Sequence, residues 1–590
     1  MKRLLLLYAL VLLAISPALA QQVKVSGKVS DADIPLPGVT VLVKGTSQGA
    51  VTNVDGAYTI ECLPTSTLVF SFIGYATQEI PVDGKTSLNV TMATDAKQLG
   101  EVVVTAFGIE REKKALGYTI QEVGGEKLAA VKTSNVVNNL SGRVAGVQVN
   151  SNGGPGSSSN IVIRGMGSVS RNNQPLVVVD GVPIQQSNSN RYGGGISEVN
   201  PDDIASMSIL KGPNAAALYG SRAANGVILI TTKNGAGTKG IGIEISSSAT
   251  FERPLVKPNF QNIYGGGNGY RTWYNNGRSG SITDPLEMEQ YRAAYGPNAP
   301  LNGTEGTDES WGAPMDGRLV RQWYTGTGVA PLTPQPNNWE EYWETGHTFS
   351  NNIALTGGND KGSFRLSVGR LDQTGIMFNN DFKRNNINIS SAYNLTPKLK
   401  ATVSGEYIKS GSDNRAYQSS QDFIWAHRSV SWDQLKNWRD YVGVHIQKQG
   451  DNLPPNWQHT FFVNPFYEQE FLTNANDKDR LRGNLSLSYD INDKLSLMVR
   501  SGTDFWTDTR TNITRFERIS NGNFRAGQFN EEVLRSQETN HDIMLTYKQD
   551  FGPDFSFNGQ AGGIYRNNYY KRNYTQVEQL VIDRLYTLNN

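Results

Sequence analysis

NPDDIASMSILKGPNAAALYGSRAANGVILITTKNG, residues Asn200 to Gly235, is the stretch from which the fold of this chain can be predicted. Met207 and Ile209 predict one apolar face of a strand. The turn-forming step Lys211-Gly212-Pro213-Asn214 and a run of alanines follow, and the β-rich run Val227 to Thr232 closes the stretch. The order strand, small-residue turn, glycine and strand is typical of a compact α/β unit packed tightly inside something else.

The first twenty residues have the three parts of a secretory signal peptide. Lys2-Arg3 form a positive region, and the apolar run Leu4 to Ile15 is too short to span a bilayer. Ala18-Leu19-Ala20 is an A-x-A cleavage site, so we expect the mature chain to begin at Gln21. A buried N-terminal helix is the weaker interpretation, because all three parts occur in order.

Composition narrows the class of protein. Apolar residues make up 38% of the chain, which also has 61 glycines, and no long apolar run follows the signal. That pattern argues against a helical membrane protein but fits a transmembrane barrel, whose strands alternate. Removing Lys2 and Arg3 from the 55 basic residues leaves 53 against 54 acidic residues, which gives no electrostatic case for nucleic-acid binding. The single Cys62 excludes an internal disulfide and is expected to be a small buried hydrophobe.

Residues 21–93 read as a small β-sandwich. Valines alternate with polar residues in its first strands, and Asp55-Gly56 predicts a hairpin turn between Val51 and Tyr58. Leu68 to Ile73 predicts a buried strand. Calcium binding by aspartates such as Asp55 is an alternative, but turn-forming roles are favoured.

Residues 94–107 read as a polar linker that ends in a short β-branched peptide. This peptide consists of Glu101, Val102, Val103, Val104, Thr105 and Ala106. Such a peptide beside a linker suits addition of a strand to the sheet edge of a partner. An ordinary edge strand of the following domain is the interpretation favoured by the peptide alone.

Residues 108–236 form the α/β unit. Asn135 to Ala145 predicts a helix, while Ile161 to Ile163 and Leu176 to Val179 predict strands. The glycine-rich stretch Asn152 to Ser159 lacks the phosphate-loop pattern and is interpreted as a loop. The charged residues Arg164, Asp180, Lys211 and Arg222 are candidates for ion pairs within this unit or with its surroundings, and a merely structural role is equally open.

Residues 237–590 alternate between apolar and polar side chains. Leu485, Leu487 and Tyr489 take one face of such a strand, with Asn484 and Ser486 on the other. About nine strands of this kind are expected, and short turns alternate with long connections near 253–346, 410–480 and 510–537. A soluble β-sandwich is the alternative, but it would not need this regular alternation of connections.

Three ordered stretches carry a family resemblance. The opening stretch, PLVVVDGVP at 175–183 and LSGRVAGVQ at 140–148 resemble the plug of TonB-dependent outer-membrane transporters, and more narrowly the SusC/RagA type. The N-terminal sandwich resembles the carboxypeptidase-regulatory-like domain that precedes many such plugs, through PLPGVTVLVKGTSQGAVTNVDGAYTI. The expected fold is therefore mainly β: a sandwich, an α/β plug, and the first part of a large antiparallel transmembrane β-barrel. Plugged barrels have roughly 22 strands, so the resemblance implies the N-terminal portion of a longer protein.

The resemblance also implies roles for particular residues. The peptide Glu101 to Ala106 would be the TonB box, and a proline at Val103 or Val104 should break it. The plug motifs would comprise Arg164, Gly165, Asp180, Gly181, Lys211, Tyr219, Gly220, Arg222, Asn225 and Gly226. The charged residues among them would couple plug movement to the barrel.

Aromatic side chains gather in the predicted loops. The candidates for ligand contact are Trp273, Tyr274, Trp311, Trp323, Trp339, Trp425, Trp432 and Trp438. Exposed aromatics suit stacking on sugar faces or gripping peptide side chains. Packing of the loops, or contact with a partner protein, is the simpler interpretation for any one of them.

The expected function is import of a glycan or peptide oligomer across the outer membrane of a Gram-negative bacterium of the Bacteroidota. The resemblance implies energy from the inner membrane through TonB and a SusD-like surface lipoprotein as partner. No cofactor is expected, and none of the five histidines sits in a recognisable catalytic motif, so the protein is not expected to be an enzyme. The alternatives are a siderophore or cobalamin receptor, a surface adhesion protein, and a sigma-factor signalling receptor, which ranks lowest.

Overall fold

The computed structural model divides the chain by contacts into two compact units, which are Met1–Val103 with Glu110–Leu116, and Val104–Ile109 with Gly117–Asn590. The structure describes residues 23–31, 34–46, 48–72, 75–93, 102–104, 110–112, 120–151, 153–169, 172–185, 192–212, 219–238, 240–266, 285, 289, 310, 312–320, 324, 330–416, 424–441, 464–515, 517–518, 524–525, 527–552, 555–582 and 585–589.

The first unit contains a β-sandwich of two four-stranded sheets. One sheet contains β2 (Ile34–Pro35), β1 (Val23–Asp31), β5 (Ala57–Cys62) and β8 (Val90–Thr91), and the other contains β4 (Gly49–Val51), β3 (Thr40–Val43), β6 (Thr67–Ser71) and β7 (Gln78–Pro81). Side chains such as Val25, Val41 and Phe70 alternate inward from both sheets and are completely buried. Cys62 is buried among them, as the sequence predicts.

The predicted hairpin between Val51 and Tyr58 is wrong. Strands β4 and β5 belong to opposite sheets, because β4 pairs with β3 while β5 pairs with β1. The turn-forming residues are present, since Gly56 has φ +70° and the Asn53 side chain accepts bonds from the Asp55 and Ala57 amides. The turn carries the chain from one sheet to the other, and a local turn pattern does not distinguish these two outcomes.

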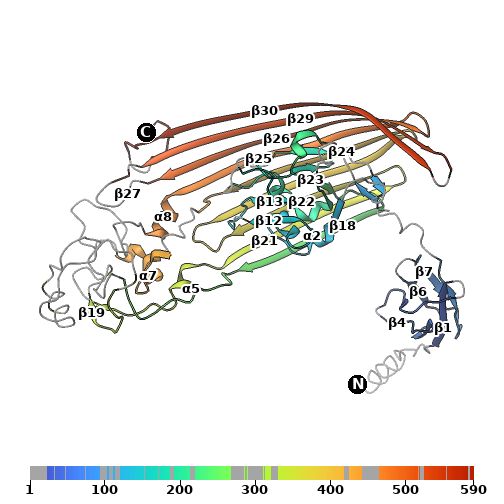
Figure 1. Cartoon of the computed structure of the whole chain (residues 1–590), viewed down its shortest axis with the longest axis horizontal. Helices are drawn as coiled ribbons and strands as arrows, with labels where there is room; N and C mark the ends of the chain where they lie inside the picture. The colour runs from blue at the N-terminus through green and yellow to red at the C-terminus, as the bar shows by residue number, and fades with distance from the viewer. Residues whose placement is uncertain are drawn as a thin grey trace, which may run out of the picture. The chain divides into compact units, whose positions relative to one another are not determined.

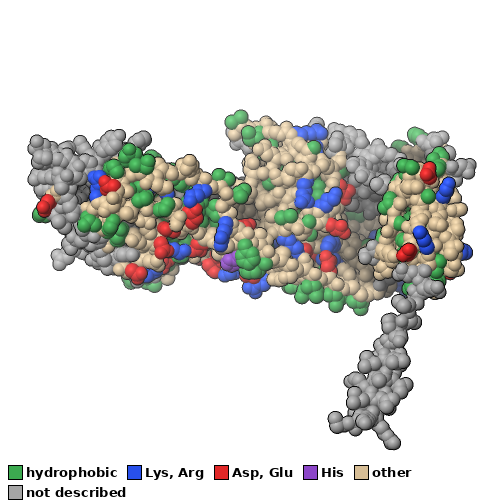
Figure 2. All heavy atoms as spheres, turned by 90° about the horizontal axis from the view of Figure 1, so that it is seen from below, with side chains coloured by type: hydrophobic (Ala, Val, Ile, Leu, Met, Phe, Trp, Pro, Cys, Tyr) green, Lys and Arg blue, Asp and Glu red, His purple; other side chains and the backbone are tan. Residues whose placement is uncertain are grey.

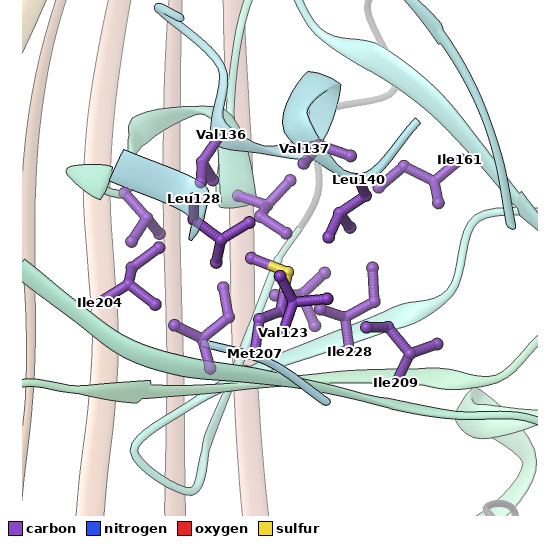
Figure 3. Close-up of a cluster of buried hydrophobic side chains, with 14 of the residues drawn as sticks. Val123, Leu128, Val136, Val137, Leu140, Ile161, Ile204, Met207, Ile209 and Ile228 are labelled. Carbon is purple, nitrogen blue, oxygen red and sulfur yellow. The ribbon is translucent and has the colours of Figure 1, made fainter. Parts of the chain in front are cut away.

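The plug is built on a five-stranded mixed sheet. Its order is β11 (Ile120–Gly124), β16 (Ile204–Leu210), β17 (Val227–Thr232), β14 (Leu176–Val179) and β15 (Val182–Ile184), with β14 and β17 parallel. Helix α2 (Gly125–Ala129), the 3-10 helix η4 (Val136–Leu140) and the hairpin of β12 (Val147–Ser151) and β13 (Ser159–Ile163) pack against it. Figure 3 shows Leu128, Val137 and Leu140 meeting Met207 and Ile228 across this core. Each such buried side chain contributes about 1.5–3 kcal/mol to folding.

The helix expected over Asn135 to Ala145 is shorter and tighter than predicted. Only Val136–Leu140 is helical, as 3-10 helix η4, which begins with the Asn135 side chain accepting the Val137 amide. Gly142 and Gly146 adopt φ near +70°, which ends any helix. The apolar spacing was therefore a sign of burial rather than of a continuous helix.

The largest element is a nine-stranded antiparallel sheet, shown in Figure 1 as long strands running side by side with the plug elements against them. In order it contains β18 (Gly240–Glu252), β21 (Gly346–Asn359), β22 (Gly362–Thr374), β23 (Asp381–Thr396), β24 (Leu399–Ser412), β25 (Thr473–Asp490), β26 (Leu495–Thr514), β29 (Gln528–Asp550) and β30 (Ser556–Val577). This sheet, called the wall below, is part of an antiparallel β-barrel. Short turns join its strands at one end, the short-turn end, and longer connections join them at the other, the long-loop end.

Alternation along the wall strands places apolar side chains outside and polar ones inside. In β22, Phe364, Leu366 and Val368 are exposed, whereas Arg365 and Ser367 are buried. Several strands extend well into the stretches expected to be loops. Strand β29 has 23 residues and is about 75 Å long, about three times the apolar band of an outer-membrane barrel. Outside such a band the outward side chains need not be apolar, so the sequence there lacks the alternation that predicts a strand.

The long connections contain short elements of their own. These are β19 (Leu319–Val320), β20 (Ala330–Pro331), α5 (Asn338–Tyr342), α7 (Trp432–Lys436), η8 (Trp438–Tyr441), α8 (Pro465–Phe471), β27 (Glu517–Arg518) and β28 (Phe524–Arg525). Among the described residues, the helices are too short or too polar to cross a membrane. On the face in Figure 2, acidic and basic side chains are interspersed, with hydrophobic side chains between them.

Candidate functional site

A short acidic stretch of the plug lies against the inner face of the wall. It runs from Gly195 to Asp203, is called the acidic segment below, and contains the 3-10 helices η5 (Gly195–Glu198) and η6 (Pro201–Asp203). Pro201 starts η6 with a preset φ, and the Asn200 side chain accepts the Asp202 amide at 3.2 Å. Every residue of the segment is buried, so its three carboxylates need partners from elsewhere in the fold.

Glu198 finds its partners on wall strand β25. Its carboxylate lies 2.6 Å from the Lys478 ammonium and 2.7 Å from the Arg480 guanidinium, which also binds Asp504 at 2.6 Å. Burial alone would raise the pKa of the Glu198 carboxyl, but the two cations outweigh it and lower that pKa to about 2. The plug carboxylate is therefore held charged inside the barrel by the wall.

Asp203 makes a second set of contacts, with strands β22 and β23. Its carboxylate accepts bonds from the Arg365 guanidinium at 3.0 Å and the Ser367 hydroxyl at 2.6 Å. Asn386 donates a further bond at 3.3 Å. Removing one partner of such a buried pair leaves a charge without compensation, at a cost of about 3–5 kcal/mol. These bonds therefore hold the plug firmly at this level.

Arg384 of β23 supports the same segment through main-chain groups. It is completely buried and donates bonds to the Ser134 and Ser197 carbonyl oxygens at 3.3 and 3.0 Å. Within the described residues, its Nε has no hydrogen-bond partner. Arg365, Arg384, Glu406, Lys478, Arg480, Arg482, Asp504 and Glu538 form what we call the charged belt of the wall.

The turn between β14 and β15 docks closer to the short-turn end. The Asp180 carboxylate accepts bonds from the Thr232 amide at 2.9 Å and the Thr232 hydroxyl at 2.7 Å, while its carbonyl oxygen accepts a bond from Asn484 of the wall at 3.2 Å. Burial raises the pKa of Asp180, against the bonds from Thr232 that favour the charged form. Gly181 has φ +82°, and a Cβ there would lie 1.9 Å from Nη1 of Arg500. The wall arginine thus occupies the space that this glycine leaves.

The four charged plug residues singled out from the sequence are placed differently from one another. Arg222 forms an ion pair with Glu538 of the wall at 2.8 Å, and Glu538 also binds Arg566 at 3.0 Å. Lys211 stays within the plug, where its ammonium donates to the Gln121 side chain and the Ala145 carbonyl. Arg164 adopts φ +58° and is exposed.

The remaining plug-motif residues shape turns and packing. Gly165 and Gly220 have positive φ, and Tyr219 lies half-buried beside Gly220. Asn225 donates to the Asn172 carbonyl at 2.9 Å. Gly226 has φ +92° and packs so closely that a Cβ would lie 2.9 Å from Ile163. None of these contacts reaches the wall in the described part of the plug.

Two family models match the first part of the chain. The TonB-dependent Receptor Plug Domain matches residues 112–227, and the CarboxypepD_reg-like domain matches residues 25–104. TonB-dependent receptor P39 of Formosa agariphila is 28% identical over 583 residues, which cover 96% of this chain and 48% of that protein. TonB-dependent receptor SusC of Bacteroides thetaiotaomicron is 27% identical over 589 residues, covering 96% of this chain and 53% of that protein.

The two matched domains and the near-complete coverage of this chain point to the same family. The chain is similar to the TonB-dependent receptors of the SusC/RagA type in its domains and along nearly its whole length. The fold agrees, since the RagAB peptide importer in the open-open state superimposes with a TM-score of 0.56 at 18% identity, over 83% of this chain and 51% of that one. The chain spans about half the length of the curated relatives it matches.

The peptide Glu101 to Ala106, which the sequence predicts to be a TonB box, is described only in part. Val102–Val104 forms strand β9, which pairs with β10 (Glu110–Glu112) in a two-stranded sheet. Glu101, Thr105 and Ala106 lie outside the described residues. The described backbone is therefore extended, the conformation that strand addition requires.

The loop aromatics fall into four groups. Trp273, Tyr274, Trp311 and Trp323 lie outside the described residues. Trp432 is completely buried in a loop core with Tyr342, Val430, Leu435 and Phe466. Trp339 packs on Phe260 and Trp343, while Trp438 packs edge-on against Tyr467 with Arg439 over its ring. Trp425 is 40% exposed and is the described tryptophan most accessible to a ligand.

Sequence reasoning missed the acidic segment and most of the charged belt. Glu198, Asp202 and Asp203 look like ordinary turn residues in the sequence. The usable signal lay in the wall strands, where Arg365 and Arg480 occupy inward positions between outward apolar residues. Among the described residues, no group of three or more histidine, cysteine, aspartate or glutamate side chains could hold a metal ion.

Proposed function

We propose that this chain supplies the plug and part of the barrel of an importer that carries a nutrient oligomer, a glycan or a peptide, across the outer membrane. The short-turn end faces the periplasm and the long-loop end faces the outside, as in other outer-membrane barrels. The energy comes from the inner membrane through TonB, which binds residues 101–106. A SusD-like lipoprotein at the long-loop end shares ligand capture. The resemblance to SusC supports a glycan, and the fold shared with the RagAB peptide importer is compatible with a peptide.

The observation that carries this proposal is the plug seated on the wall through buried charges. Glu198 and Asp203 together contact four basic or hydroxyl side chains on strands β22 and β25. Such bonds close the barrel at rest, and they require work to break. A gated transporter needs a plug that is held in place at rest and can be released, whereas an adhesion protein has no need to release it.

The proposed role of residues 101–106 as a TonB box is tested with the full-length gene in its native host. Val104→Pro removes a main-chain donor from the predicted partner strand, whereas Val104→Ala keeps it. We expect the proline variant to lose growth on one nutrient class, glycans or peptides, with normal protein levels in the outer membrane. The alanine variant should grow as the parent does. Unchanged growth of the proline variant on every glycan, peptide, siderophore and cobalamin source would favour an adhesion protein.

The growth panel also separates the other transport hypothesis. A siderophore or cobalamin receptor would show its defect only under iron or vitamin limitation. An importer of oligomers would show it when a glycan or a protein digest is the main nutrient. The class of nutrient on which growth fails therefore names the class of substrate.

A further inference from the structure

A cavity lies between the plug and the wall on the short-turn side of the charged belt. Its volume is about 400 Å³, within the range of small-ligand sites. The plug contributes Asp180, Thr232 and Asn234 to its lining. The wall contributes mainly hydroxyl and amide side chains from adjacent strands: Ser390, Thr402, Ser404, Asn484, Ser486 and Ser488. We call this space the hydroxyl-lined cavity.

The strand register explains why these groups form a continuous surface. Ser390 pairs with Ser404, and Ser404 pairs with Asn484 on the next strand. Thr402 pairs with Ser486 one rung nearer the short turns. Directly paired side chains in a sheet lie about 4.5–5.5 Å apart, so these hydroxyl and amide groups are neighbours across three strands. A hydroxyl both donates and accepts hydrogen bonds, so this surface can satisfy either need of a ligand.

The described lining has four charged side chains, which are one carboxylate and three cations. Asp180 is its one carboxylate, and that group already accepts two bonds from Thr232. Arg500 is paired with Asp542, and the other two cations are Lys400 and Lys548. The described part of the lining has no aromatic ring, so its residues would hold a ligand by hydrogen bonds without a stacking platform.

We propose that the hydroxyl-lined cavity is a transit site for an uncharged, hydroxyl-rich oligomer, that is, a neutral glycan chain. This inference rests on the proposed import function and names its substrate class. Sugar hydroxyls would replace water on the serine, threonine and asparagine side chains, with little change in the number of hydrogen bonds. Weak, multiple bonds of this kind suit passage, because a transit site must admit a ligand and also release it. Among the described lining groups, a basic peptide would meet three cations and one carboxylate, which already accepts two bonds from Thr232.

The proposal is tested in the full-length importer in its native host by filling the cavity. Ser486→Trp places a ring in the cavity, whereas Leu485→Trp places the same ring on the outward face of the same strand, where Leu485 is 49% exposed. We expect at least about a tenfold lower rate of glycan uptake for Ser486→Trp, with unchanged surface binding, and parental uptake for Leu485→Trp. Thr402→Val keeps the side-chain volume and removes a hydroxyl, so it should fold and reduce uptake several-fold.

The nutrients used as probes are soluble starch, laminarin, xylan and a casein digest, each compared with the box variant Val104→Pro. Box-dependent growth on the casein digest alone would overturn the glycan site while leaving energised import intact. Box-dependent growth on a glycan with parental uptake in both Ser486→Trp and Thr402→Val would also overturn it. Growth on every nutrient independent of the box would overturn the import function and the transit site together.

Discussion

Two neighbouring zones of the inner wall differ sharply in chemistry. In the charged belt, Glu406 is paired with Arg482 across β24 and β25, and the next belt residues bind the acidic segment of the plug. One rung nearer the short turns, Ser404 is paired with Asn484. There the Asn484 and Ser390 side chains donate hydrogen bonds to the plug carbonyl oxygens of Asp180 and Lys233. We infer that the two zones have different roles. The charged belt holds the plug, and the hydroxyl-lined zone offers hydrogen-bonding groups to a ligand as it passes.

The largest expected effect comes from breaking the belt at its most connected cation. Arg480→Met leaves Glu198 with one cation and Asp504 without its arginine, both buried. We expect the plug of the full-length protein to lose about 3–5 kcal/mol of stability, measured by calorimetry in detergent. Lys409→Met is the matched control, because Lys409 is partly exposed and pairs with surface aspartates, which should change stability by less than about 1 kcal/mol.

A smaller effect is expected at the turn that docks beside the hydroxyl-lined cavity. Gly181→Ala adds backbone strain at φ +82° and pushes against the Arg500 guanidinium, for a total of roughly 2–3 kcal/mol. Gly220→Ala has similar strain at φ +69° but open space around its Cβ, so it should cost only about 1 kcal/mol. Equal unfolding temperatures for the two variants would argue against close docking of the turn on the wall.

Lowering the pH should weaken the contacts between the plug and the charged belt, because the Glu198 carboxylate becomes protonated. Its pKa in the folded protein is about 2, below the ordinary value of 4.5, so its contribution is complete above pH 4.5 and is lost as the pH falls towards 2. By about pH 3 the plug should have lost about 2 kcal/mol through this group. The measurement compares plug unfolding between pH 5 and pH 3 in the parent and in Glu198→Gln. An identical acid response in both would show that other groups dominate.

The smallest effect is expected at the ion pair between Arg222 of the plug and Glu538 of the wall. Arg222→Met should cost only about 1 kcal/mol, because Glu538 keeps its bond to Arg566 and Arg222 is partly exposed. The double variant Arg222→Met with Arg566→Met leaves Glu538 buried without an arginine and should lose more than the two single changes added together. Simple additivity in this cycle would mean that Glu538 is not shared between plug and wall.

The sequence predicted those parts of the fold that depend on local alternation. Leu485 and Leu487 face outward while Asn484 and Ser486 face inward, as expected from their spacing. Strands β16 and β17 also lie where Met207 and Val227 placed them. The role of a residue could not be predicted where that role depends on a partner far away in the sequence. Glu198 becomes a buried ion-pair residue only because Arg480, almost 300 positions later, comes to lie beside it.

The roles of the loop tryptophans also depend on partners that are distant in the sequence. Trp432 and Trp425 are seven residues apart in one expected loop, and nothing in their local sequence separates them. The structure buries Trp432 among residues from three different helices and leaves Trp425 partly exposed. The contacts of Trp432 with Tyr342 and Phe466 come from segments distant in sequence, so only the folded loops distinguish packing from access.

A reversible tether tests most directly whether ligand crosses only when the plug leaves the wall, as the proposed function requires. In full-length protein whose native cysteines, including Cys62, are replaced by serine, Gln185→Cys on the plug and Ser536→Cys on the wall replace uncharged side chains that are joined by a hydrogen bond. These two cysteines would be joined by a short reducible thiol cross-linker in the native host. We expect uptake of the box-dependent nutrient to stop on cross-linking and to return after reduction, and we expect each single-cysteine variant to take up the nutrient at the parental rate. Uptake at the parental rate with the plug tethered would contradict this expectation.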